Sequence, residues 1–214
     1  MNRRVPSLLA ASALALGAVS ATVPANAQAA RGNDSLASVL TSDGNTFDKN
    51  SADFDILTEA ALAVVGAKPD SPVGLITDGS QPLTVFAPTD EAFRQLAKDL
   101  TGKTVKSEEK IFGALVELAG VDTIESILLY HVVPGATLTS AKVLKADGAR
   151  LETANGAKVK VTVKMPEHRA PSVILKDRDR NARNARAILE ALDINKGNKQ
   201  IAHAIDRVLR PINL

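Results

Sequence analysis

The sequence predicts an α+β domain with a largely antiparallel sheet. Segments with the periodicity of helices come mostly in the first part of the chain. Segments that alternate apolar and polar residues come mostly in the last part, from about residue 150. There the Asn155-Gly156 pair is typical of the tight turn of a β-hairpin.

Residues 1–29 have the layout of a secretory signal peptide. Two arginines precede an uncharged apolar run at 8–23, and two small-residue cleavage signals follow it. A membrane anchor is the alternative, but the run is shorter than the ~20 apolar residues that a span needs. We therefore expect cleavage near Ala27 or Ala29, and a mature protein that is secreted to the extracellular space or the cell envelope (periplasm) with no membrane span.

Composition narrows the classes of function. The chain carries a net charge of +2, and the expected signal peptide holds two arginines and no acid, so the mature chain is close to neutral. This balance gives no support for nucleic-acid binding. One Tyr and no Trp leave little surface for stacking on bases or sugar rings. The absence of Cys excludes disulfides, so stability must come from the core.

A flexible segment at 30–35 is expected to precede a domain over 36–212. The first long helix is expected over 51–66, with Asp53 as its N-cap and Gly66 just past its end. One buried face carries its regularly spaced apolar residues: Leu57, Ala60, Ala61 and Val64.

The segment LTVFAPTDEAF, at 83–93, predicts a sharp strand-to-helix reversal. A strand over 83–87 ends at Pro88, because the residue before a proline avoids the helical region. Thr89 or Asp90 is then expected to cap a short helix. The proline and the capping residues thus have structural roles, and the segment needs no catalytic explanation.

Further helices and strands follow in order. Helices are expected over 107–120, from 122 to about 130, and over 137–144, with an extended segment between the last two. Strands are expected over 158–164, 172–176 and 199–209. In the first of these strands valines alternate with lysines, which indicates one buried and one wet face. The intervening segment 177–199 is expected to be loop with one helical turn at 187–192.

Three segments together resemble the motifs of the fasciclin domain, in the family's order. They are LTVFAPTDEAF at 83–93, LLYHVVPG at 128–135 and IAHAIDRVLRP at 201–211. The resemblance implies a compact wedge, an antiparallel β-sandwich with several helices packed around it. It also implies an adhesion or matrix-interaction module with no cofactor and usually no catalysis. The motif residues expected to have structural roles are Phe86, Pro88, Thr89, Asp90, Phe93, Tyr130, His131, His203 and Asp206.

Two departures from the family pattern concern partner binding. The segment 165–199 is longer and more basic than in the family. Family members that bind integrins often carry an Asp-Ile pair, and Asp55-Ile56 is similar to it, so both are candidate partner contacts. An Arg-Gly-Asp triplet is absent, and integrin binding is not carried over.

The histidines are expected to be structural. His131 and His203 lie in apolar segments, which favours buried, neutral rings over catalysis, whereas His168 is expected to be exposed. The segment DRDRN at 177–181 resembles the start of a calcium loop, but the later ligand positions do not fit. We therefore predict no catalytic residue, cofactor or metal.

A basic run at 176–186 carries five cations and two acids. It is either a solvated loop or a patch for an anionic polysaccharide or another acidic surface. The candidate contacts are Arg178, Arg180, Arg183 and Arg186. The leading hypothesis is a secreted, non-catalytic adhesion module that binds a cell-surface or matrix protein or an anionic polysaccharide. The alternatives are a carrier of a small apolar ligand and a histidine-dependent hydrolase.

Overall fold

The computed structural model describes residues 31–42 and 44–213. The predicted signal peptide and its cleavage site lie outside the described residues. The described part has the predicted α+β class and contains two sheets, one of three strands in the order β2-β1-β7 and one of four in the order β3-β4-β5-β6.

The three-stranded sheet is built on a parallel pair. Strand β1 (Leu83–Pro88) pairs in parallel with β7 (Gln200–Ile205) and antiparallel with β2 (Val132–Pro134). Every residue of β1 and β7 is buried. The expectation of a largely antiparallel sheet therefore holds for the other pairings but not for this central one.

The four-stranded sheet is antiparallel throughout. It comprises β3 (Arg150–Glu152), β4 (Lys158–Lys164), β5 (Ser172–Lys176) and β6 (Ala185–Arg186). The predicted Asn155-Gly156 turn joins β3 to β4, and Gly156 has the positive φ, 80°, that such a turn requires. The valines of β4 face inward and its lysines outward, as their alternation predicts.

The helices fall mostly in the first part of the chain. They are α1 (Leu36–Leu40), α2 (Asp55–Ala67), α3 (Asp90–Thr101), α4 (Glu108–Tyr130) and α5 (Ser140–Val143), with 3₁₀ turns η1 (Pro72–Thr77) and η2 (Leu189–Ala191). The Ser107 side chain caps α4 by accepting from the Lys110 N–H. The two helices expected on either side of Gly120 are joined in α4, and Gly120 breaks it with φ 70° and ψ 166°. Gly66 lies within α2 and not past its end.

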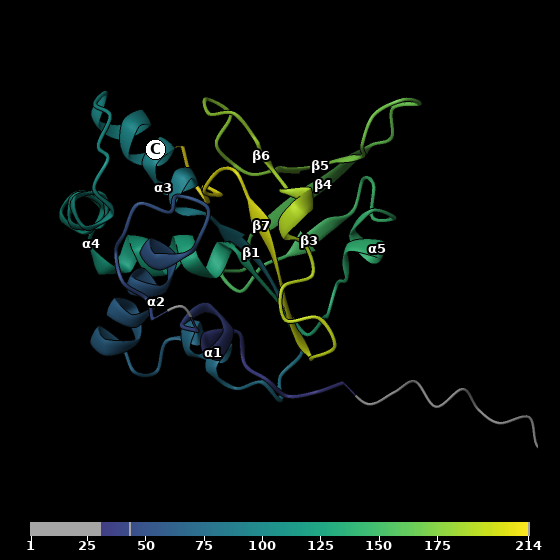
Figure 1. Ribbon diagram of the computed structural model, residues 1–214, viewed down its shortest axis with the longest axis horizontal. Coiled ribbons are helices and arrows are strands. Elements are labelled where there is room, and N and C mark those ends of the chain that lie inside the picture. Colours follow the sequence, from purple (N-terminus) through teal and green to yellow (C-terminus); the bar gives the residue numbers. More distant parts are fainter. Residues whose placement is uncertain (1–30, 43, 214) are drawn as a thin grey trace, which may run out of the picture. The chain divides into compact units, whose positions relative to one another are not determined.

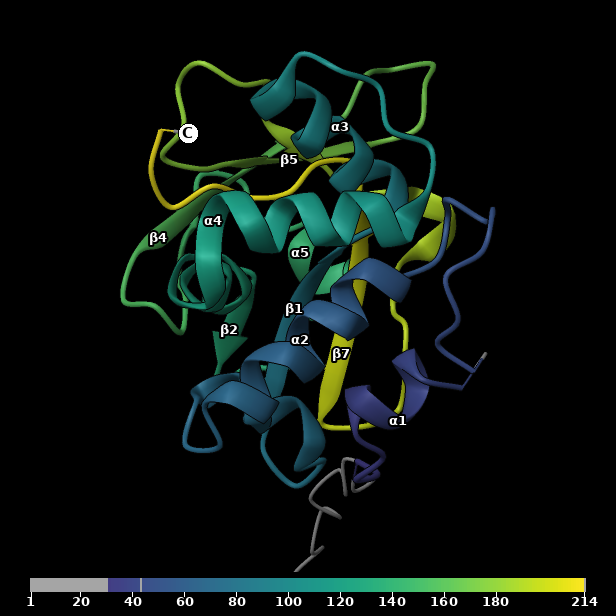
Figure 2. The ribbon, with the colours of Figure 1, turned by 90° about the vertical axis from the view of Figure 1, so that its left-hand side faces the viewer.

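The central parallel pair separates two apolar cores. In Figure 1, α1, α2 and α4 lie on one side of β1 and β7, and β3, β4 and β5 lie on the other. Figure 2 shows α2 and α4 in front of the same strands. Val85 and Phe93 belong to the core under the helices, whereas Phe86 packs with Val159 and Leu175 in the core between the sheets.

The reversal at 83–93 joins α2 to α3 by reciprocal hydrogen bonds. The Asp90 carboxylate accepts from the Ile56 N–H at 3.0 Å, near the start of α2. In return, the Asp90 N–H donates to the Asp53 carbonyl at 3.1 Å, and the Glu91 N–H donates to the Ser51 carbonyl at 2.9 Å. Backbone N–H groups at the start of each helix, which have no partner within their own helix, thus bond to acceptors in the other segment.

Two predicted caps are corrected by this arrangement. Phe54, and not Asp53, is the N-cap residue of α2. Thr89 does occupy the N-cap position of α3, but its side chain makes no cap hydrogen bond. The Asp90 side chain caps its neighbour and not its own helix, because the two helices begin side by side.

Replacing either motif phenylalanine by alanine should strongly destabilise the domain. Phe86 and Phe93 are 1% and 4% exposed and lie in different cores, so each change leaves a cavity and should cost ~3–5 kcal/mol. Chemical denaturation measures the loss. Leu118→Ala, at a side chain that is 60% exposed, is the control and should change stability by less than ~0.5 kcal/mol. Wild-type stability in Phe93→Ala would contradict the assigned packing.

Candidate functional site

The ring nitrogens of His131 both bond to backbone groups. Its Nδ1 donates to the Ile127 carbonyl at 2.7 Å, and its Nε2 accepts from the Leu209 N–H at 2.8 Å. The second bond requires an unprotonated Nε2, which fixes the neutral Nδ1–H tautomer. The ring therefore ties the end of α4 to the segment that follows β7.

His203 is held in the same way with the opposite tautomer. Its Nε2 donates to the Leu138 carbonyl at 2.6 Å, and its Nδ1 accepts from the Asp193 N–H at 3.2 Å. Both histidines are 1% exposed. Because backbone groups occupy all four ring nitrogens, neither histidine is available as a general base, and the geometry gives no support to a histidine-dependent hydrolase. His168 is exposed, as expected.

Two other motif residues also bond to the backbone. Tyr130 is fully buried, and its hydroxyl donates to the Lys158 carbonyl at 3.1 Å. Burial raises the pKa of this hydroxyl to about 12. The Asp206 carboxylate accepts from the Arg186 N–H at 2.7 Å and forms an ion pair with Arg183. The closing motif thus holds β6 in place.

The acidic residues of the run at 177–181 surround a buried arginine. Arg210 is 5% exposed and donates to Asp179 at 3.0 Å and to Asp99 of α3 at 2.5 Å, while its backbone N–H donates to Asp177 at 2.9 Å. Arg178 and Arg180 are exposed beside them. The run is therefore not a fully solvated loop. Its two aspartates bond to Arg210 near the end of the domain, whereas its two arginines are exposed to solvent.

The Asp-Ile pair proposed as a partner contact is buried. Asp55 is 3% exposed and Ile56 is 0% exposed at the start of α2. This corrects the expectation that the pair contacts a partner, because neither side chain reaches the surface. The resemblance rests on two adjacent residues, whereas the burial of these residues depends on α3, which packs against α2.

A basic sheet face runs across the outside of the four-stranded sheet. We use this name for the exposed residues Arg150, Lys158, Lys160, Lys164, Lys176 and Arg186. Lys160 pairs with Arg150 on β3 and with Lys176 on β5, so these three side chains form one row across three strands. Sequence reasoning identified the wet face of β4 but missed the row, because the row depends on strand register.

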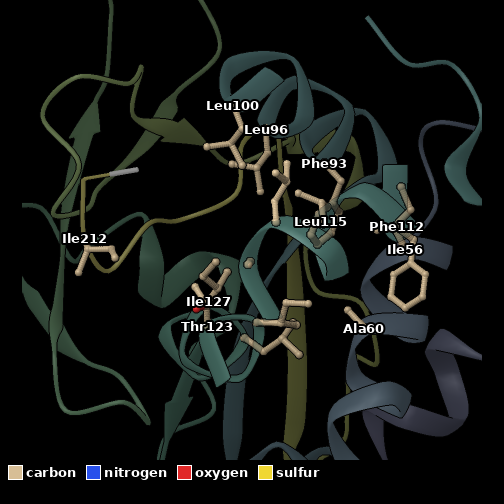
Figure 3. Close-up of a pocket in the computed structure, with 14 residues that line it drawn as sticks. Ile56, Ala60, Phe93, Leu96, Leu100, Phe112, Leu115, Thr123, Ile127 and Ile212 are labelled. Atoms are coloured by element: carbon tan, nitrogen blue, oxygen red, sulfur yellow. The ribbon is translucent and has the colours of Figure 1, made fainter. Parts of the chain in front are cut away.

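An apolar pocket lies among α2, α3, α4 and the C-terminal segment. It has a volume of about 400 Å³. Figure 3 shows the side chains around it, with Leu115 and Ile127 from α4, Leu96 from α3 and Ile212 from the C-terminal segment. Ile212 is 55% exposed, so the pocket meets the surface beside an apolar rim.

Over the part of the chain that the structure describes, no helix has the length and apolar character to cross a membrane.

Comparison with known proteins gives one family. The sequence model of the fasciclin domain matches residues 71–211. The chain is also similar to a solved structure of a FAS1 domain pair from the insect cell adhesion molecule fasciclin I, with 18% identity and a TM-score of 0.46. That similarity covers 76% of this chain and 46% of the other, so this chain spans less than half of that domain pair. No curated protein sequence matches.

The buried histidines should make stability depend on pH. Burial lowers the pKa of His131 to about 4, and burial also lowers that of His203, although the nearby Asp193 carboxylate opposes the shift. The unfolded chain, with histidine pKa near 6.5, therefore takes up protons first as the pH falls. The histidine contribution is complete above pH ~6.5 and is lost toward pH 4, on the order of 3 kcal/mol for His131.

Denaturation of variants between pH 7.5 and 4.5 checks this. His131→Gln and His203→Gln should each flatten the slope of stability against pH, apart from any overall loss of stability. The exposed His168→Gln is the control and should keep the wild-type slope. Identical slopes in all four proteins would contradict neutral burial.

Proposed function

Because the chain belongs to the fasciclin family, we propose that it is a secreted, non-catalytic adhesion or interaction module. Secretion rests on the signal-peptide layout of residues 1–29 and on the predicted cleavage near Ala27 or Ala29. The absence of catalysis is supported by the two histidines, whose ring nitrogens all bond to backbone groups. The partner is expected at the cell surface or in the matrix.

The basic sheet face is the observation that carries the choice of partner. Its six cations are accompanied on the same sheet face by one exposed acid, Glu152, which pairs across with Lys158. Nearby Asp179 offsets little of this charge, because its carboxylate pairs with the buried Arg210 guanidinium, whereas Asp177 accepts only from the Arg210 backbone N–H. The surface is therefore much more positive than the near-neutral chain as a whole.

A flat row of lysines and arginines suits an extended anion. Sulfate and carboxylate groups repeat along an anionic polysaccharide, and arginine can bind either group through two parallel hydrogen bonds. We propose that such a polysaccharide binds across β3, β4 and β5, with Arg178, Arg180 and Arg183 extending the surface beyond β5. Binding should be sensitive to salt, because exposed charges are screened over ~8 Å at physiological ionic strength.

Neutralising three lysines of the basic sheet face should weaken retention on immobilised heparin at low salt. Lys158, Lys160 and Lys176 changed together to Gln should reduce affinity about tenfold, since each exposed contact contributes up to ~1 kcal/mol. The control changes Lys103, Lys106 and Lys110, which are exposed elsewhere, and so removes the same charge. Equal elution of the two variants would contradict a specific face.

A second variant measures how much the loop after β5 contributes to heparin binding relative to the sheet. Arg178 and Arg180 changed to Ser should cause a smaller loss than the lysine variant, with unchanged melting. Arg183 is left in place because its ion pair with Asp206 supports the start of β6.

The apolar pocket favours a second candidate, a carrier of a small apolar ligand. Its lining is almost wholly aliphatic and aromatic, as such sites require, with Thr123 as a polar side chain on the wall. Ligand carriage and adhesion use different surfaces, so one result does not decide the other.

Filling the pocket tests the carrier hypothesis. Mass spectrometry of solvent extracts should find an apolar small molecule that co-purifies with the wild type and is lost from Ala119→Trp, because the indole occupies the cavity. Glu117→Trp, at an exposed site on the same helix, should retain the molecule. Extracts without any bound molecule would argue against a carrier.

A further inference from the structure

Five carboxylates gather where three helices begin. Asp55, Asp90 and Glu108 are the first residues of α2, α3 and α4, and Asp48 and Asp53 lie just before α2. They form two overlapping groups of three that share Asp55, one with Asp53 and Asp90 and the other with Asp48 and Glu108. Within each group, one oxygen of every residue lies within 4.8 Å of the others.

Two of these side chains are buried with an unsatisfied oxygen. Asp90 is 0% exposed, and while its Oδ1 accepts from Ile56, its Oδ2 has no hydrogen-bond donor among the described residues. Glu108 is 1% exposed; its Oε2 accepts from the Asp48 N–H at 2.7 Å. Its Oε1 has no hydrogen bond and lies 3.7 Å from the Arg94 guanidinium. Buried oxygens without a partner are costly, so each is expected to face a ligand that would satisfy it.

The cluster brings together five carboxyl groups, and the Arg94 guanidinium lies 3.7 Å from the Glu108 carboxylate. The positive ends of three helices and one ion pair with Arg94 offset part of the charge. The remainder can be relieved by a proton shared between Asp53 and Asp90 or by a bound cation.

We propose that Asp53, Asp55 and Asp90 bind one calcium ion, with Asp48 and Glu108 completing its shell of oxygen ligands. Calcium takes six to eight oxygens at ~2.3–2.6 Å, so two oxygens on one ion lie at most ~5 Å apart, a limit that the oxygens within each group of three meet. Magnesium demands a near-ideal octahedron and keeps several waters, which suits a dense group of carboxylates less well.

The site has a route to solvent. A surface cavity of about 670 Å³ is lined by Asp48, Glu108 and Arg94, so an ion can enter at the side of the cluster formed by Asp48 and Glu108. An ion bound there would connect the starts of α2, α3 and α4. The hydrogen bonds of Asp53 and Asp90 join α2 to α3, and Glu108 at the start of α4 accepts from the Asp48 N–H. The inference is independent of the proposed function, because none of its ligands belongs to the basic sheet face.

Melting with and without calcium tests the proposal. The purified chain is stripped with a chelator and compared with the same protein in calcium at ~100 times its dissociation constant, which titration calorimetry supplies. Binding to the folded state alone should raise the melting temperature by about 5–10 °C. The same concentration of magnesium should give a clearly smaller rise.

Two variants locate the ion. Asp90→Asn keeps an oxygen that can accept from Ile56, and Glu108→Gln keeps one for Asp48, yet each removes a charge from the cluster. Each should weaken calcium binding at least tenfold, whereas the exposed Glu117→Gln should behave as the wild type.

Three results would overturn the proposal. Wild-type protein without a calcium heat or melting shift would leave the shared proton as the explanation. An equal response to magnesium would overturn the assignment to calcium. A full calcium response in both cluster variants would place the ion elsewhere. If Asp90→Asn does not fold, Glu108→Gln and the wild-type calorimetry still decide.

Discussion

The parallel pairing of β1 with β7 is the constraint on which the other elements depend. Six consecutive residues of each strand are in register and buried, from Leu83 opposite Gln200 to Pro88 opposite Ile205. A strand buried on both faces needs two cores, and the helices supply one while the second sheet supplies the other. Both strands must be in place before either core can be completed, so the two ends of the domain depend on each other.

Buried histidines and the buried Arg210 fix the position of the segment that follows β7. His131 accepts from Leu209, four residues beyond β7, and Arg210 then bonds to Asp179 and to Asp99. Polar groups in such an interior are costly unless every partner is present, which makes their geometry specific. The closing motif is thus a set of anchors for the end of the domain, which explains its polar residues without catalysis.

The sequence predicted the features whose causes are local. The helix start at Ser107, the Asn155-Gly156 turn and the inward valines of β4 each depend on neighbours within a few residues. It could not predict the parallel pairing, because nothing local distinguishes a parallel partner from an antiparallel one. Asp90, one of the two candidate caps for its own helix, accepts instead from the Ile56 N–H, and this role depends on where α2 begins.

Both candidate charged sites were concealed by the overall charge. The chain has 26 basic and 24 acidic residues, so composition alone indicates no charged partner. Strand register gathers Arg150, Lys160 and Lys176 into one exposed row. The carboxylates of Asp55, Asp90 and Glu108 come together because the three helices that they begin start close to one another. Because electrostatic attraction falls with distance and is screened by salt, this local segregation, and not the net charge, determines what each surface can bind.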